Sequence, residues 1–110
     1  VAGEQSSRNW GWVRCMNRDP AELPLAMEAQ RLWAAVDAEV DGATGFAQTG
    51  ISYLCGTDER LASWEFWLEM AAQHGLRSHF VSGREVADRM PQLAKPYVGA
   101  LCTPTDGRAE

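Results

Sequence analysis

The sequence lacks several features that mark common functional classes. No apolar run approaches the ~20 residues that a membrane-spanning helix needs, and no basic block suggests nucleic acid or an anionic membrane surface as a partner. With 10 basic and 15 acidic residues, the formal net charge is −5. No signal segment, internal repeat or low-complexity stretch is visible. We therefore expect neither a nucleic-acid-binding nor a membrane-spanning protein.

Cysteine and histidine are scarce and widely spaced. Cys15, Cys55 and Cys102 form no C-x-x-C pair, and neither His74 nor His79 has ligand spacing with them. This pattern argues against a zinc site and against a disulfide framework. Three free thiols indicate a reducing compartment and hence a cytoplasmic location. Cys15 lies beside a basic segment, so a reactive thiol is the alternative to a buried, inert one.

The segment 4–14 is suited to a ligand that is both anionic and aromatic. It shows no apolar periodicity, which predicts a loop. Short polar side chains favour tight turns, glycine permits close approach, arginine matches phosphate or carboxylate, and tryptophan offers flat apolar faces. These residues are Ser6, Ser7, Arg8, Asn9, Trp10, Gly11, Trp12 and Arg14. An ordinary surface loop with exposed arginines is the alternative interpretation.

A helix is predicted after this loop. Asp19 and Pro20 form a helix start, although Pro24 removes a donor and can delay the regular helix. Asp41-Gly42 predicts its end near Val40. The apolar stripe at helical spacing is Leu25, Ala29, Leu32, Trp33, Val36 and Val40. We expect Trp33 in the core, with a ligand-facing wall as the alternative.

The rest of the chain predicts short strands and two further helices. The sequence favours two strands within 45–55 joined at Thr49-Gly50, a helix from 57 or 58 to Gly75, a strand at 78–81, a helix at 82–91 and a strand at 97–103. Ser82 and Glu85 spell a capping box for the last helix. The predicted fold class is α+β, with three helices and a small, largely antiparallel sheet.

The run Ser6-Ser7-Arg8-Asn9-Trp10-Gly11 resembles the flavin-contacting loop of the FAD-dependent amino-acid and amine oxidoreductases. That family includes D-amino acid oxidases, sarcosine oxidase and glycine oxidase. The similarity covers nearly the whole chain in order, and order and spacing carry it more than any one motif. It continues through Asp19-Pro20, Gly45-Phe46, Gly50-Ile51, the helix around Trp64 and Thr103-Pro104-Thr105-Asp106-Gly107.

The resemblance implies FAD as the cofactor and a small amino acid or amine as the substrate. The implied reaction oxidises the substrate C–N bond to an imine with hydride transfer to the flavin. The implied cofactor-binding residues are Ser6, Ser7, Arg8, Asn9, Gly11 and Trp12. Arg14 is the candidate catalytic residue, holding a substrate carboxylate or the charge of reduced flavin. A surface salt bridge is the alternative role of Arg14.

The resemblance also implies missing parts. The family's G-x-G-x-x-G turn and its ribose-binding acid are absent. We therefore expect an internal fragment, inactive alone, of an enzyme with an FAD-binding α/β domain and a substrate-binding α+β domain. Residues 1–18 would be the flavin-contacting loop, 19–44 a helix leading toward the substrate domain, and 45–110 the first part of that domain.

A different class of function stays open. Five tryptophans among 110 residues is a high content, and tryptophan is favoured at protein interfaces. The alternative is thus a small α+β domain without catalytic activity that binds a protein partner through an acidic, tryptophan-bearing surface. The sequence indicates neither the particular substrate nor the oligomeric state.

Overall fold

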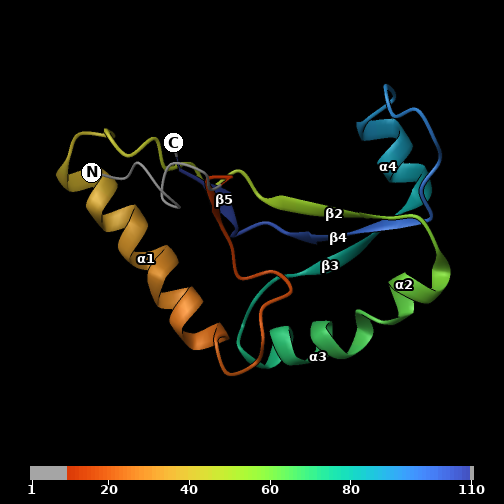
Figure 1. The fold of residues 1–110 in the computed structure, drawn as a ribbon, viewed down its shortest axis with the longest axis horizontal. Helices are drawn as coiled ribbons and strands as arrows, with labels where there is room; N and C mark the ends of the chain where they lie inside the picture. The colour runs from red at the N-terminus through yellow and green to blue at the C-terminus, as the bar shows by residue number, and fades with distance from the viewer. Residues whose placement is uncertain (1–9, 110) are drawn as a thin grey trace.

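The structure, a computed structural model, describes residues 10–109 (Figure 1). The main sheet has the antiparallel order β2-β4-β3, formed by Ile51–Cys55, Gly99–Thr103 and His79–Ser82. A smaller sheet pairs β1 (Trp12–Val13) with β5 (Gly107–Arg108). The helices of the described part are α1 (Leu23–Glu39), α2 (Asp58–Ala62), α3 (Glu65–Gln73) and α4 (Gly83–Arg89). This architecture confirms the predicted α+β class with small antiparallel sheets.

The central strand β4 is buried along its whole length because both faces of the main sheet are covered. Side chains alternate between the faces of a strand. On one face, Leu101 and its register partners Tyr53 and Phe80 pack against the cluster that includes α3. On the other face, Ala100 packs with Val86 of α4.

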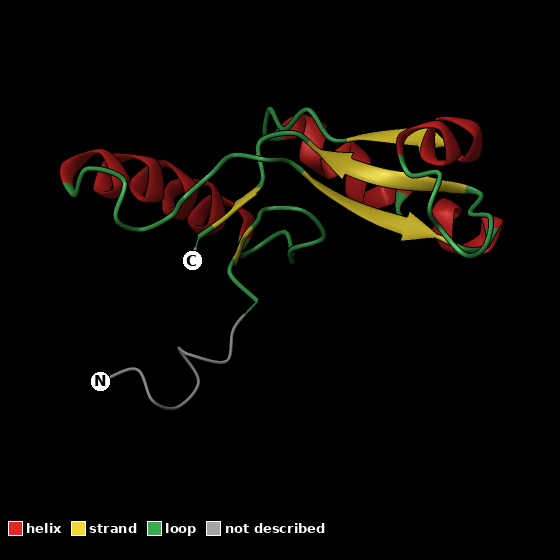
Figure 2. Cartoon of the chain, turned by 90° about the horizontal axis from the view of Figure 1, so that it is seen from above, coloured by secondary structure: helices red, strands yellow, loops and turns green. Residues whose placement is uncertain are grey.

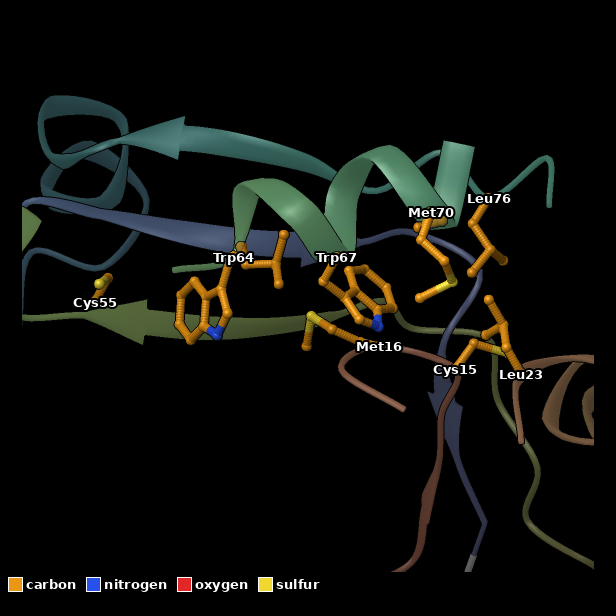
Figure 3. Packing of buried hydrophobic residues seen from close by; sticks show 10 residues of the cluster. Cys15, Met16, Leu23, Cys55, Trp64, Trp67, Met70 and Leu76 are labelled. Atoms are coloured by element: carbon orange, nitrogen blue, oxygen red, sulfur yellow. The ribbon is translucent and has the colours of Figure 1, made fainter. Parts of the chain in front are cut away.

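The larger core cluster ties α3 to the chain that follows β1. Figure 3 shows Trp64, Trp67 and Met70 of the α3 region lying over Met16 and Leu23. The indole Nε1 of Trp67 also donates a hydrogen bond to the Arg18 carbonyl at 2.9 Å. Burial of each large apolar side chain contributes about 1.5–3 kcal/mol. This cluster therefore fixes the position of the segment between β1 and α1.

The second predicted helix is divided into α2 and α3. Thr57 caps α2 by accepting from Arg60 N–H, as the sequence indicates. The helix then breaks at Ser63, whose hydroxyl donates to the Arg60 carbonyl at 2.7 Å. Trp64 N–H bonds to Leu61 O at 3.1 Å, a tighter turn than an α-helix makes. The break turns both Trp64 and Trp67 toward the core.

Helix α1 projects away from the main sheet, as Figures 1 and 2 both show. Its regular part starts beside Pro24, after a turn in which Ala21 N–H donates to the Asp19 carboxylate at 2.8 Å. Leu23 is the buried residue of this helix, and much of the expected core stripe is exposed: Leu25, Leu32, Trp33, Val36 and Val40. The expectation that Trp33 lies in the core is therefore wrong for this structure.

The segment 45–55 also differs from its prediction. Only Ile51–Cys55 forms a strand, and its partner is β4 instead of the preceding residues. Ala47 makes an isolated bridge to Arg108, and Gly50 N–H donates to the Asp106 carbonyl at 2.7 Å. Residues before β2 are thus bonded to the turn after β4 and to β5, a long-range pairing that local sequence does not encode.

Helix α4 begins with the predicted capping box. The Ser82 side chain accepts from Glu85 N–H, and the Glu85 side chain accepts from Ser82 N–H. The hydrogen bonds that the Glu85 carboxylate accepts, from Ser82 N–H and from the Ser82 hydroxyl, lower the pKa of Glu85. Within residues 10–109, none of the helices has the length and apolar character required to cross a membrane.

Candidate functional site

The predicted ligand loop enters the described structure at Trp10 and Gly11. Gly11 has a φ of +68°, and a Cβ built there would lie 2.4 Å from the Ala109 carbonyl oxygen. The Ala109 N–H donates to the Gly11 carbonyl at 2.8 Å, next to the β1–β5 pairing. The structure thus shows both properties that favour glycine here: a left-handed backbone and a close backbone approach.

A cavity of about 900 Å³ lies between this loop and helix α1. Such a volume is within the range of small-molecule and cofactor sites. Its lining residues come from the start of the described chain, from α1, from the turn after α1 and from the end beyond β5. They are Trp10, Gly11, Trp12, Val13, Arg14, Arg18, Ala26, Ala29, Trp33, Thr44 and Ala109. Gly11, Trp12 and Arg14, predicted from sequence, are therefore brought to one cavity.

Three tryptophans line the cavity, and the rings of Tyr53 and Phe46 pack against two of them from outside the lining. Trp10 and Trp12 meet edge to face with ring centres 5.5 Å apart, and Trp12 lies 5.9 Å from the ring of Tyr53. On the α1 side, Trp33 stacks on Phe46 with ring centres 6.4 Å apart. Trp33 is 38% exposed and faces the cavity, which agrees with the alternative interpretation from sequence. Flat apolar walls of this kind suit an aromatic ligand.

Two arginines supply positive charge at the cavity. Arg14 donates from Nη1 to the Met16 carbonyl and lies over the Tyr53 ring, 5.8 Å from its centre. Arg18 has Nη1 3.6 Å from the Glu22 carboxylate, and its buried Nε has no hydrogen-bond partner among residues 10–109. Arg18 was missed by the sequence analysis because no regular spacing links it to Arg14 across the irregular segment between β1 and α1.

A buried acid, Asp106, binds residues that are next to cavity-lining residues in the sequence. Both carboxylate oxygens of Asp106 accept backbone hydrogen bonds, from Cys15 N–H at 2.7 Å and Met16 N–H at 2.9 Å. Gln30 Nε2 donates to the same carboxylate at 2.7 Å. Burial and the nearby charge of Asp106 raise the pKa of the Cys15 thiol to about 11. The sequence analysis names Asp106 only within the run Thr103-Pro104-Thr105-Asp106-Gly107 that continues the family resemblance, because a buried role for Asp leaves no local signal.

Some predicted residues and sites receive no structural test. Ser6, Ser7, Arg8 and Asn9 lie outside the described residues.

Within residues 10–109, no group of His, Cys, Asp and Glu could hold a metal ion, and Cys15, Cys55 and Cys102 are free and buried. The buried state of Cys15 and its raised pKa favour the inert interpretation of this thiol over the reactive one.

Comparisons with known proteins agree on one family. Residues 1–110 match the family model described as DAO, FAD dependent oxidoreductase. Among solved structures, L-amino acid deaminase from Proteus myxofaciens in complex with anthranilate gives a TM-score of 0.88 at 21% identity over 99% of this chain. Glycine oxidase from Geobacillus kaustophilus gives 0.84 at 22% identity over 99%. L-proline dehydrogenase from P. horikoshii gives 0.75 at 25% identity over 87%.

The chain is much shorter than the structures it matches. It spans 26% of the deaminase, 31% of the glycine oxidase and 25% of the proline dehydrogenase. At these identities, the likeness to the deaminase and the glycine oxidase shows a shared fold. No curated protein matches the sequence.

Proposed function

Because the chain belongs to the FAD-dependent oxidoreductase family, we propose that it is a segment of a larger flavoenzyme that oxidises the C–N bond of an amino acid or secondary amine to an imine. The observation that best supports this proposal is the cavity of about 900 Å³, which is lined by three tryptophans and two arginines. The names of the structural neighbours support an amino-acid substrate, because they are an L-amino acid deaminase, a glycine oxidase and an L-proline dehydrogenase.

The residues at the cavity fit a ligand with the chemistry of FAD. Trp12 and Trp33 provide flat apolar surfaces, and Arg18, which lines the cavity, has a buried Nε donor without a partner in the described part of the chain. Gly11 keeps the loop backbone against Ala109, where a side chain would collide. When bound, FAD supplies the hydride acceptor for the reaction.

This segment contributes binding and orientation in the proposed enzyme. Ser6, Ser7, Arg8 and Asn9 are proposed to bind the phosphates and the ring edge of the cofactor, and Gly11 and Trp12 to border its ring. Arg14 is proposed to bind the substrate carboxylate or to stabilise negative charge on the reduced cofactor. Residues 1–18 would belong to the flavin-binding part, 19–44 would lead to the substrate domain, and 45–110 would begin it.

A protein-interaction module is the second candidate. The exposed apolar residues of α1 favour it, because apolar patches often mark contact sites. Colour separates the two functions. The full-length protein purified from cells is expected to be yellow with bound flavin if it is an oxidoreductase. A colourless preparation that stays folded would contradict the enzyme proposal.

The direct test is Arg14→Ala in the full-length protein. We expect flavin absorbance per mole of protein to stay unchanged while the apparent affinity for an amino-acid substrate weakens. Loss of a charge-assisted contact to a carboxylate costs roughly 1.5–3 kcal/mol, or about 10- to 150-fold in kcat/KM. Arg14→Lys should restore only part of this, because an ammonium cannot reproduce the two-pronged fork.

Arg31→Ala provides the matched control. Arg31 lies on α1, is exposed and pairs with Glu28 at 2.6 Å, so its loss removes an arginine without touching the cavity lining. Flavin content and kinetics should match those of the unmodified protein. If Arg14→Ala also leaves kcat/KM unchanged across a panel of amino acids and amines, the proposed role of Arg14 is wrong.

A further inference from the structure

The buried carboxylate of Asp106 holds three donors from two distant parts of the chain. Two are the backbone N–H groups of Cys15 and Met16, and the third is the side-chain amide of Gln30 on α1. Hydrogen bonds to a charged acceptor are stronger than those between neutral groups. Asp106 therefore links the turn before β5, the segment after β1 and helix α1 at one point.

Gln30 extends this link to the other side of Arg14. Its Nε2 donates to the Val13 carbonyl at 3.2 Å as well as to Asp106 at 2.7 Å. The backbone is thus bound at Val13, just before Arg14, and at Cys15 and Met16, just after it. Bonds on both sides restrict the directions in which the Arg14 side chain can leave the backbone.

The same link determines where the Arg14 guanidinium lies. Arg14 Nη1 donates to the carbonyl of Met16, and the N–H of Met16 is bound to Asp106. The acceptor that orients Arg14 is therefore itself held by the buried acid. The guanidinium lies over the Tyr53 ring, and Arg14 lines the cavity.

We propose that Asp106 and Gln30 form a positioning pair that sets the orientation of Arg14 toward the substrate. The inference rests on the proposed function, because it assigns the pair a role in the affinity for substrate. Neither residue is among those that line the cavity, so both act through Arg14. A small misplacement of a binding group is enough to weaken catalysis strongly.

The competing explanation is that Asp106 and Gln30 only stabilise the fold. A double mutant separates this explanation from a role in positioning Arg14. In the flavin-loaded full-length protein, Gln30→Met keeps the length of the side chain and removes both of its donated bonds. We expect KM for an amino-acid substrate to rise about tenfold. The value of kcat, the flavin content and the melting temperature should stay close to those of the unmodified protein. In an Arg14→Ala background, Gln30→Met should change KM by less than about twofold, because the group it positions is absent.

Amide hydrogen exchange gives a readout that does not depend on activity. Exchange at Cys15 and Met16 should be about tenfold faster in Gln30→Met, since their acceptor is less well held. Asp106→Asn should act in the same direction and more strongly. It places an amide NH2 against a backbone N–H and threatens folding, so Gln30→Met is the primary variant.

Ser78→Ala is the matched control. It removes one partly buried hydrogen bond, to the Thr103 hydroxyl at 2.7 Å, without a bond to the segment after β1. KM should stay unchanged. Equal KM effects of Gln30→Met in the presence and absence of Arg14 would overturn the positioning role while leaving the role of Arg14 intact. If Arg14→Ala alone leaves KM unchanged, the proposed role of Arg14 is wrong, and the positioning role with it.

Discussion

Arg14 lies over the ring of Tyr53, with its guanidinium carbon 5.8 Å from the ring centre. The contact joins the segment after β1 to strand β2, two parts of the chain that are far apart in sequence. It places positive charge at the edge of an aromatic series in which Tyr53 lies between Trp12 and Trp64, at 5.9 Å and 6.3 Å. Two residues that line the cavity, Trp12 and Arg14, are thus held against the main sheet through Tyr53.

The first prediction concerns the ring beneath Arg14. Tyr53→Leu removes the cation–π contact, which is worth about 0.5–1 kcal/mol, and should raise KM roughly two- to fivefold in the full-length protein. Tyr53→Phe keeps the ring and should leave KM unchanged. Steady-state kinetics with flavin content measured in parallel provide the check. A loss in Tyr53→Phe equal to that in Tyr53→Leu would assign the effect to the hydroxyl group.

The second prediction concerns Gly11. Gly11→Ala requires a left-handed alanine, at about 1–2 kcal/mol, and also brings Cβ within 2.4 Å of the Ala109 oxygen. Gly42→Ala has a similar φ of +78° and meets nothing within 4 Å. Gly11→Ala should therefore be less stable than Gly42→Ala by about 1–3 kcal/mol and should bind less flavin. Urea unfolding and flavin absorbance measure both, and equal losses would contradict the close approach.

The third prediction compares two tryptophans. Trp67 is 7% exposed and donates to the Arg18 carbonyl, so Trp67→Ala should cost about 3–5 kcal/mol of the free energy of unfolding. Trp33 is more exposed and stacks on Phe46. Trp33→Ala should cost only about 0.5–1.5 kcal/mol, yet should reduce flavin retention because it opens the cavity wall. If Trp33→Ala lowered the free energy of unfolding as much as Trp67→Ala, Trp33 would be a core residue of the full-length protein, contrary to this prediction.

The fourth prediction follows from the pKa of Cys15, which burial and the charge of Asp106 raise to about 11. An unfolded thiol ionises near 8.5. The unfolded state therefore loses its proton first as pH rises. The free energy of unfolding should fall between pH about 8.5 and about 11, by at most roughly 1.4 kcal/mol per pH unit. Below pH 8.5, where both states keep the proton, this contribution to stability is complete.

Cys15→Ala is the control for this pH dependence. Comparing urea midpoints of the two proteins from pH 8 to 11 removes the shared titration of the other groups. The stability difference between them should shrink by the amount that Cys15 contributes. Parallel curves would show that the native thiol ionises like an unfolded one, contrary to its buried position.

Local sequence was sufficient to predict a helix end where residues close together in the chain provide the hydrogen bonds or backbone conformation that form it. The capping box of Ser82 and Glu85 was confirmed because both of its bonds lie within four residues. The start of α1 near Pro24 and the end of α3 before Gly75, which has a φ of +78°, were predictable for the same reason. The family resemblance was also available from sequence, because it rests on the order of short motifs along the chain.

Tertiary structure decided which of these pieces meet. The pairing of β2 with β4, the bonds from Asp106 to Cys15 and Met16, and the contact of Arg14 with Tyr53 all join residues far apart in the chain. No local pattern specifies such partners, since each depends on how the main sheet and the α3 cluster place the segment after β1. The apolar stripe of α1 likewise predicts that one face of the helix packs against something, but it does not name the partner. Trp33 lines the cavity because α1 projects away from the main sheet.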